Sequence, residues 1–90
     1  FFKVRYERCS LADKKFIFAM VKCGELPCTI SNIATNLHKP VKSISPTRAQ
    51  LINKGLVYSA RYGELDFTVP EFTGFIQRQE DYNKWCSTEA

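Results

Sequence analysis

The chain has 90 residues, of which 44% are hydrophobic and 24% charged, with a formal net charge of +4. This length allows one domain with a modest core. No apolar run approaches the roughly 20 residues that a helix needs to cross a bilayer, and the N-terminus is too charged for a secretory signal. We therefore expect a cytoplasmic protein that does not bind membranes. Because the chain begins with Phe1 and not with Met, we also expect a fragment of a longer protein.

Four cysteines are present: Cys9, Cys23, Cys28 and Cys86. A cytoplasmic setting keeps thiols reduced, so we interpret Cys23 and Cys28 as small, partly buried apolar residues beside a turn. A zinc site is disfavoured because the chain has no CxxC pair and His38 is its single histidine. A disulfide or a reactive thiol is the remaining alternative. We expect no metal and no other cofactor.

The charge excess is confined to the middle of the chain. No acidic residue occurs between Glu25 and Glu64, whereas five basic residues do: Lys39, Lys42, Arg48, Lys54 and Arg61. Removing these five from the 13 basic residues leaves eight, against nine acids, a balance of −1. A local charge of one sign is typical of a surface that binds a polyanion, although a solvated basic face has the same composition.

The first predicted helix runs from about Leu11 to Cys23. Ser10 is the expected N-cap, and Asp13 lies in the first turn, where the helix dipole favours a carboxylate. Gly24 is expected to end the helix because glycine readily adopts a positive φ. Apolar side chains recur at helical spacing and predict one buried face, made of Ala12, Phe16, Ala19, Met20 and Cys23.

A second short helix is predicted from Asn32 to about Leu37, with Ser31 as its N-cap. Its buried face would contain Ile33, Ala34 and Leu37, and tertiary packing must hold it because it has only about two turns. The sequence His38-Lys39-Pro40 then predicts a tight turn.

A third helix is predicted from about Pro40 to Lys54, and Gly55 ends it. Pro46 interrupts this segment and lacks the N–H that a helix interior requires. We therefore expect one bent helix with an irregular first turn. The alternative is a helix that starts at Pro46 with Ser45 as its N-cap.

Two β-type runs, "LVYSA" and "LDFTV", flank the connection "RYGE", which contains Gly63 and predicts a hairpin. Pro70 ends the second strand, and a last helix is expected from about Glu71 to about Tyr82. This order of elements predicts an α+β fold, mostly α: a winged helix-turn-helix with a three-helix core, a β-hairpin wing and a C-terminal helix. We expect an N-terminal extension over residues 1–10, the winged-helix domain over 11–82 and a tail over 83–90.

DNA binding is the function that this pattern favours. In a helix-turn-helix, the N-terminal half of the second helix enters the major groove. Hydroxyl groups discriminate poorly between bases, and no arginine lies early enough for guanine readout, so we expect modest sequence specificity. Arg48 borders the apolar stripe, and a structural role suits it as well as a DNA contact. The candidate DNA-binding residues are Ser31, Lys39, Lys42, Ser43, Ser45, Thr47, Arg48, Lys54, Arg61 and Tyr62.

Phosphate contacts would come from several parts of this set. Ser31 begins a helix whose free N–H groups can hold a phosphate, and Arg61 and Tyr62 lie at the tip of the wing. Four phosphate contacts are predicted, from Lys39, Lys42, Lys54 and Arg61. The logarithm of the binding constant for duplex DNA should therefore fall with the logarithm of the salt concentration with a slope of roughly −4, which we call the salt slope.

Catalysis has no support in the sequence. The P-loop, dinucleotide-binding, GxSxG and HExxH motifs are all missing, and one histidine with scattered carboxylates forms no recognisable acid–base pair. We expect no enzymatic activity and no small-molecule substrate. The alternative to DNA binding is a protein–protein or intramolecular interaction domain, because one fold serves many functions. The aromatic-rich last helix, with Phe72, Phe75 and the Tyr82–Trp85 region, would then be the docking surface.

The stretch "SISPTRAQLINKGLVYSARYGELDFTVPEF" resembles the C-terminal winged-helix domain that follows the AAA-type P-loop domain in a family of prokaryotic ATPases. The resemblance covers about Leu11 to Gln79. It departs from the family at Tyr62, where a second basic residue is common, and at His38, where glycine is common. The matching positions are Ser45, Pro46, Arg48, Leu51, Ile52, Lys54, Gly55, Leu56, Gly63, Glu64, Phe67, Thr68, Val69 and Pro70.

The resemblance implies an accessory domain that docks DNA, or a partner, beside an ATP-driven module. The AAA-type ATPase domain of the same chain would then be a partner, and an interaction with it would regulate the ATPase. No residue of this chain can be assigned to nucleotide binding.

Overall fold

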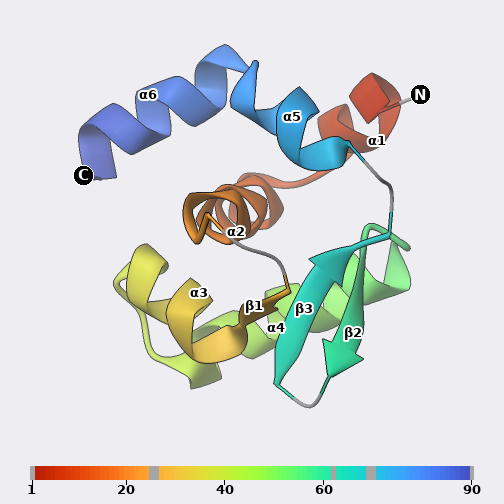
Figure 1. Ribbon diagram of the computed structural model, residues 1–90, viewed down its shortest axis with the longest axis vertical. Coiled ribbons are helices and arrows are strands. Elements are labelled where there is room, and N and C mark those ends of the chain that lie inside the picture. Colours follow the sequence, from red (N-terminus) through yellow and green to blue (C-terminus); the bar gives the residue numbers. More distant parts are fainter. Residues whose placement is uncertain (1, 25–26, 62, 69–70, 90) are drawn as a thin grey trace.

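The computed structural model describes residues 2–24, 27–61, 63–68 and 71–89. It is an α+β domain, mostly helical, with a three-stranded antiparallel sheet in the order β1-β3-β2, as expected for the fold class. Figure 1 shows the elements in chain order: α1 (Phe2–Glu7), α2 (Leu11–Lys22), β1 (Cys28–Thr29), α3 (Ile30–Leu37), α4 (Val41–Asn53), β2 (Val57–Arg61), β3 (Glu64–Phe67), α5 (Phe72–Gln77) and α6 (Glu80–Glu89).

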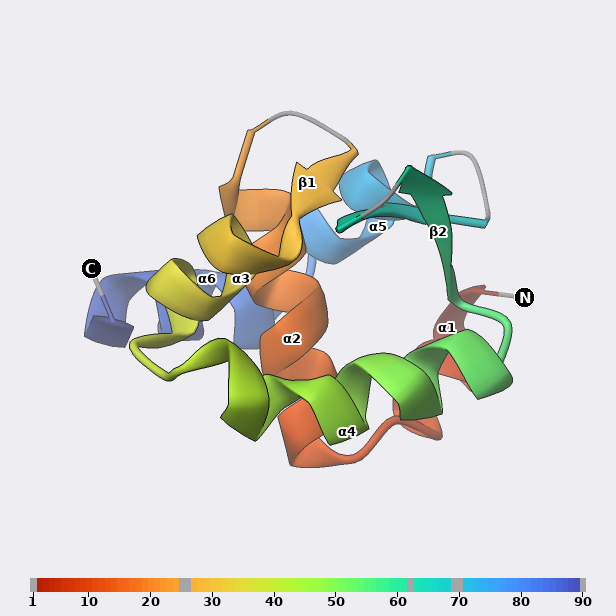
Figure 2. The same cartoon turned by 90° about the horizontal axis from the view of Figure 1, so that it is seen from below.

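Helix α2 is the centre of the molecule. Helices α3 and α4 lie on one side of it, and α5 and α6 lie on the other (Figure 1). Figure 2, seen from below, shows α4 crossing in front of α2. Phe16, Ile17 and Met20 are at most 1% exposed. A helix enclosed in this way is apolar on most of its surface, so the buried part of α2 is wider than the single face predicted. Ala12, which was placed on that face, is exposed.

The start of α2 confirms the predicted cap. The backbone N–H of Asp13 donates to the Ser10 hydroxyl at 3.2 Å, and the N–H of Ser10 donates to the Asp13 carboxylate at 3.2 Å. This reciprocal pair is a capping box, which satisfies backbone donors that would otherwise have no partner in the helix. Gly24 follows α2 with a φ of +81°, as predicted for a helix end.

The N-cap of α3 differs from the prediction. Helix α3 begins at Ile30, and the Thr29 hydroxyl accepts the Asn32 N–H at 3.2 Å, so Thr29 and not Ser31 is the N-cap. The physical reason is that Thr29 still belongs to β1. Its backbone is extended, with φ −72° and ψ 149°, and the next N–H, of Ile30, donates to Gly63 at 2.8 Å. The helix therefore starts where the sheet pairing ends.

Helix α4 is continuous from Val41 to Asn53, with Pro46 inside it. The prediction of one helix is confirmed, and the alternative start at Pro46 is wrong. Proline removes one backbone donor, which leaves the carbonyl four residues earlier, that of Lys42, without its usual helical partner. Lys42 is exposed, so a water molecule can donate a hydrogen bond to this carbonyl. The Ser45 hydroxyl donates to the Val41 carbonyl at 3.0 Å in the same turn.

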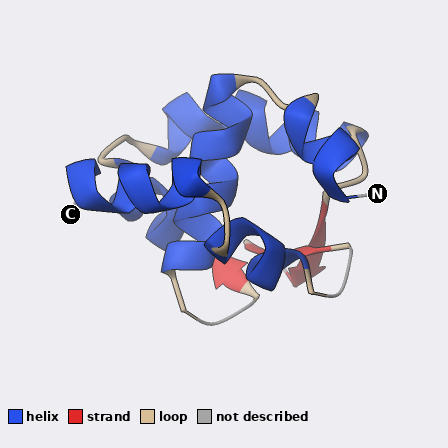
Figure 3. Ribbon diagram, turned by 90° about the horizontal axis from the view of Figure 1, so that it is seen from above, coloured by secondary structure: helices blue, strands red, loops and turns tan. Residues whose placement is uncertain are grey.

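The predicted hairpin is confirmed, and a third strand joins it. In the hairpin, Val57 is paired with Phe67 and Ser59 with Leu65. The residues that alternate inward on β3, Leu65 and Phe67, are buried. The two-residue β1 pairs with β3 and is too short to give a periodic signal in the sequence. Figure 3 shows the strands gathered on one side of the molecule.

The two ends of the chain contribute to the core. Tyr6 of α1 is 4% exposed and Trp85 of α6 is 8% exposed. The segments 1–10 and 83–90, expected to be an extension and a tail, therefore both supply core residues. The single last helix ending near Tyr82 was also wrong, because two helices are present and α6 continues to Glu89.

Cys23 and Cys28 form a disulfide that joins the end of α2 to β1. The two Cα atoms are 6.5 Å apart, within the usual range for a disulfide. The expectation of reduced thiols at these two positions is wrong. Cys9 and Cys86 are not part of this bond.

Candidate nucleic-acid interface

Residues 38–40 connect α3 to α4 in a turn that is fixed by backbone hydrogen bonds. His38 takes the left-handed conformation, with φ 57°. Its N–H donates to Thr35 at 3.1 Å, and the N–H of Lys39 donates to Ala34 at 3.1 Å. These bonds satisfy the last carbonyls of α3 and set the direction in which α4 leaves. His38 thus performs a conformational role that glycine usually fills.

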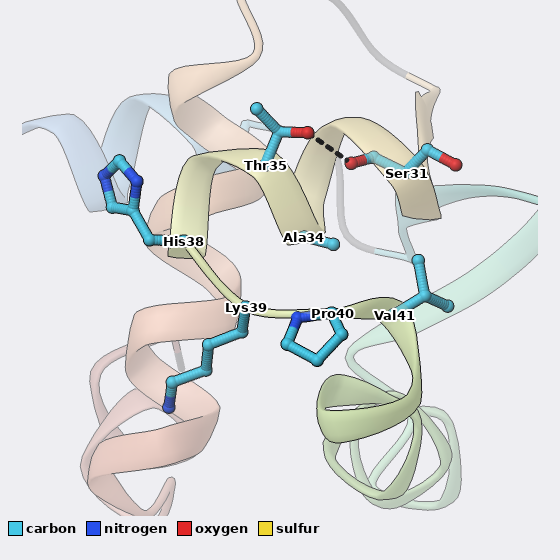
Figure 4. A pocket seen from close by; sticks show the side chains of 7 residues that line it. All are labelled: Ser31, Ala34, Thr35, His38, Lys39, Pro40 and Val41. Atoms are coloured by element: carbon cyan, nitrogen blue, oxygen red, sulfur yellow. Dashed lines mark hydrogen bonds between the residues drawn. The ribbon is translucent and has the colours of Figure 1, made fainter.

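An open groove of about 470 Å³ lies between α3 and the start of α4. Its walls combine hydroxyl groups, a lysine and small apolar side chains, and the Thr35 hydroxyl donates to the Ser31 carbonyl at 3.0 Å (Figure 4). The lining residues are Ser31, Ala34, Thr35, His38, Lys39, Pro40 and Val41.

The outward side of α4 is a stripe of small or polar side chains that begins beside this groove. We call it the α4 stripe, and its exposed members at helical spacing are Lys42, Ser45, Pro46, Ala49 and Gln50. On the opposite side of the helix, Ile44 and Leu51 are buried at 3% and 0% exposure. The α4 stripe contains no acid and no large aliphatic side chain. It is therefore hydrated in the free protein and does not repel a polyanion.

The predicted residues of α4 fall into two groups. Lys42, Ser43 and Ser45 are exposed, whereas Thr47 and Arg48 are half-buried. Half-burial of Arg48 agrees with its position at the border of the apolar stripe, where the aliphatic part of the side chain can pack while the charge reaches solvent.

Lys54 does not join the candidate interface. Its Nζ lies 2.6 Å from the carboxylate of Asp13, whose side chain is fully buried. The hydrogen bond that Lys54 donates to the Asp13 carboxylate raises the pKa of Lys54, so the lysine remains charged and holds the end of α4 against the start of α2. Sequence reasoning missed this pair because the two residues are 41 positions apart and Asp13 already had a role in the cap.

The hairpin supplies the remaining candidates. Arg61 is exposed at the end of β2, and Lys39 is exposed in the turn before α4. Ser31, the second residue of α3, is exposed in the groove. Tyr62 lies outside the described residues. Tyr58 was not predicted as a DNA-binding residue, although it is an aromatic residue of β2 whose side chain is 45% exposed. The signal was present in the alternation of "LVYSA", which places Val57 inward and Tyr58 outward.

The aromatic side chains proposed as an alternative docking surface lie largely inside. Phe72 is 1% and Trp85 is 8% exposed, while Phe75 and Tyr82 are half-buried against the core. Their rings pack on one another, with Phe72 and Phe75 stacked at 5.8 Å between centroids. The last two helices therefore use their aromatic residues for folding.

Other kinds of site are missing from the described part of the chain. There, no group of three or more His, Cys, Asp or Glu side chains is arranged to hold a metal ion. None of the helices described is long and apolar enough to cross a membrane.

Comparison with known proteins identifies a family. No curated protein and no solved structure matches the chain. A family model described as "Domain of unknown function (DUF8462)" matches residues 1–76, which include α1 to α4, the whole sheet and most of α5. That description names no activity, so the resemblance to ATPase winged-helix domains stays a prediction. Because the match covers well over half of its length, the chain belongs to the DUF8462 family.

Proposed function

We propose that this chain is a winged helix-turn-helix domain that binds duplex DNA with modest sequence specificity. Helix α3, the turn over residues 38–40 and α4 correspond to the helix-turn-helix, and the β2–β3 hairpin corresponds to the wing. The observation that carries the proposal is the α4 stripe, an acid-free polar helix face in the segment that holds the chain's excess positive charge.

The dimensions and chemistry of α4 suit a major groove. A helix with its side chains is about 10–12 Å wide, and the groove is about 12 Å wide. The small side chains of Ser45 and Ala49 permit close approach. Ser43 and Ser45 would contact phosphates or base edges, and the exposed Gln50 would pair with adenine. No arginine on the α4 stripe provides guanine readout, which is why specificity is modest.

Three exposed cations would neutralise phosphates: Lys39 before α4, Lys42 in its first turn and Arg61 on the wing. Lys54 is left out because Asp13 holds it. Three contacts correspond to a salt slope of about −3, lower in magnitude than the value of about −4 expected from the sequence.

The setting of the domain is also a proposal. Its resemblance to ATPase winged helices supports an accessory, non-catalytic role beside an AAA-type ATPase in a longer cytoplasmic protein. The Cys23–Cys28 disulfide is unusual for a reducing compartment. Counting free thiols in protein taken rapidly from cells would test the cytoplasmic location, and a bonded Cys23–Cys28 pair would argue against it.

The test of DNA binding is a titration of fluorescently labelled duplexes, followed by anisotropy at several salt concentrations. We expect saturable binding that weakens with a slope of about −3, and Lys42→Ala and Arg61→Ala should each reduce the slope by about one. Gln50→Ala should change the ranking of duplexes of different sequence more than it changes the salt slope.

Arg78→Ala is the matched control, because Arg78 is an exposed cation next to α5, outside the interface. It should leave the slope unchanged. The proposal fails if no saturable binding occurs at low ionic strength. It also fails if Arg78→Ala weakens binding as much as Lys42→Ala does, since that would indicate attraction by net charge alone.

A further inference from the structure

A second groove, of about 240 Å³, is lined by residues of α2 and α6. Helix α6 lies on the side of α2 away from α3 and α4 (Figure 1). We call it the α2–α6 groove. Apolar side chains from both helices line it, together with several charged ones. The lining residues are Leu11, Lys14, Lys15, Phe18, Asp81, Lys84 and Trp85.

The apolar part of this groove combines packed rings with an uncovered leucine. Phe18 and Trp85 line the groove and are buried, with ring centroids 5.8 Å apart. Leu11, in contrast, is 68% exposed, whereas the other large apolar side chains of α2 are buried. Covering such a leucine with another apolar group is favourable, because burial of a side chain of this size is worth about 1.5–3 kcal/mol.

The size of the groove limits what can fill it. Sites for drug-sized molecules and cofactors usually span about 300–1,000 Å³, so this groove is below that range. A single large side chain of a macromolecular partner fits it better than a free small molecule does.

The charges around the groove identify the partner's sign. Three lysines and one aspartate line it, for a net +2. The aspartate, Asp81, accepts a hydrogen bond from the Tyr6 hydroxyl at 3.3 Å. Lys84 is 3.6 Å from Glu80, but both side chains are more than 70% exposed, and such an ion pair contributes little. Lys14 Nζ lies over the Tyr6 ring, 4.7 Å from its centroid, a contact that does not neutralise its charge. The lysines can therefore still pair with carboxylates from outside.

We propose that the α2–α6 groove docks an acidic protein segment, which inserts one large apolar side chain beside Leu11 and Trp85 and places carboxylates against Lys14, Lys15 and Lys84. Nucleic acid would meet the lysines but would gain little from covering Leu11, so the combination favours a protein partner. Since the groove lies across α2 from the α4 stripe, both surfaces can be occupied together.

Trp85 makes the groove directly observable, because it is the chain's single tryptophan. The probes are arrayed synthetic peptides without tryptophan, in which one leucine or phenylalanine is flanked by glutamates, by serines or by lysines. We expect the protein to be retained by the glutamate series alone. In solution the best glutamate peptide should shift the Trp85 fluorescence in a saturable manner.

Variants on the exposed rim sharpen this test. Leu11→Glu and Lys84→Glu should each weaken binding of the best peptide about tenfold, equivalent to ~1.4 kcal/mol. Lys15→Glu, at a half-buried position, provides a third variant. Arg78→Glu, a charge reversal outside the groove, should weaken it far less. Circular dichroism confirms folding, which substitutions at exposed positions should preserve.

The proposal is overturned if no peptide series retains the protein, or if the serine or lysine series retains it as well as the glutamate series does. It is also overturned if Arg78→Glu weakens peptide binding as much as Lys84→Glu. A labelled duplex that displaces the peptide and itself shifts the Trp85 fluorescence would assign the groove to nucleic acid instead, and also overturns it. None of these results depends on DNA binding by the α4 stripe, so the two proposals can fail separately.

Discussion

The two sides of α2 are held in different ways. On the side of α1, α5 and α6, rings pack around Phe18, with centroid distances of 6.3 Å to Tyr6, 5.6 Å to Tyr82 and 5.8 Å to Trp85. On the side of α3 and α4, polar and covalent links join neighbouring elements to α2. Among them are the Asp13–Lys54 ion pair, the hydrogen bond from Asn36 to the Ala19 carbonyl and the Cys23–Cys28 disulfide to β1.

This difference extends to the surface. The ring-packed side carries exposed acids, among them Glu71, Glu80 and Asp81, whereas α3, α4 and β2 have none. Because like charges repel, a polyanion meets no acid over α3, α4 and β2, which favours the α4 stripe as its approach face. A domain can thus present one face to a polyanion even though its net charge is only +4.

The largest effect should come from removing a ring. Trp85→Ala leaves a cavity beside Phe18 and should lower the free energy of unfolding by about 3–5 kcal/mol, measured by urea denaturation. Ser87→Ala, an exposed position on the same helix, should stay within about 0.5 kcal/mol. Equal effects of the two changes would mean that α6 is a loosely attached tail, as the sequence had suggested.

The ion pair is the next test, on the polar side. Lys54→Met leaves the buried carboxylate of Asp13 without its cation, which should cost about 3 kcal/mol of stability, the lower end for a broken buried pair because Lys54 is partly exposed. DNA affinity at matched folded concentration should hardly change. If Lys54→Met instead weakened DNA binding with stability intact, Lys54 would belong to the interface after all.

Alkaline pH should act on the ring-packed side. Burial raises the pKa of Tyr6 to about 12 from an ordinary value of 10.0, and burial likewise raises the pKa of Tyr82 to about 12. A raised pKa in the folded state means that this stability is complete below pH 10 and is lost as the pH rises from 10 to 12. Circular dichroism should show unfolding in that window.

Phenylalanine substitutions show which tyrosines are responsible for unfolding at alkaline pH. Tyr6→Phe or Tyr82→Phe should move the alkaline transition to higher pH, because one ionising group is removed from the core. Tyr58→Phe, at an exposed site on β2, is the control and should not move it. If neither Tyr6→Phe nor Tyr82→Phe shifted the alkaline unfolding transition, its assignment to these two tyrosines would be wrong.

The disulfide should have a moderate effect. Closing a loop between residues five positions apart corresponds to about 2 kcal/mol in the chain-entropy description. The double change Cys23→Ala and Cys28→Ala should therefore lower the stability by about that amount, and dithiothreitol should do the same to the unchanged protein. Dithiothreitol should have no effect on the double variant, and an effect there would indicate another cause.

The smallest expected effect distinguishes two neighbouring hydroxyls. Thr29→Ala removes the N-cap of α3 and should cost about 1 kcal/mol, whereas Ser31→Ala removes no cap and should stay within about 0.5 kcal/mol. Thermal unfolding of the two variants decides the matter, and the reverse order would restore Ser31 as the cap.

Much of the fold was predictable because its causes are local. The capping box of Ser10 and Asp13, the turn before α4 and the alternation of Leu65 and Phe67 each depend on residues a few positions apart. The candidate interface followed from these elements, since helical spacing alone separates the exposed Lys42 and Ser45 from the buried Ile44 and Leu51. Thr29 escaped prediction because its role depends on where strand pairing stops.

By itself, the sequence determined the order of α2, α3, α4 and the β2–β3 hairpin, the acid-free basic segment and the outward side of α4, all through short-range periodicity and composition. The tertiary structure alone decided that Lys54 meets Asp13, that β1 pairs with β3 and that Trp85 of α6 packs on Phe18 of α2. These contacts join residues about 35 to 70 positions apart. Their energy depends on which surfaces face each other after the chain collapses, and no local pattern records that.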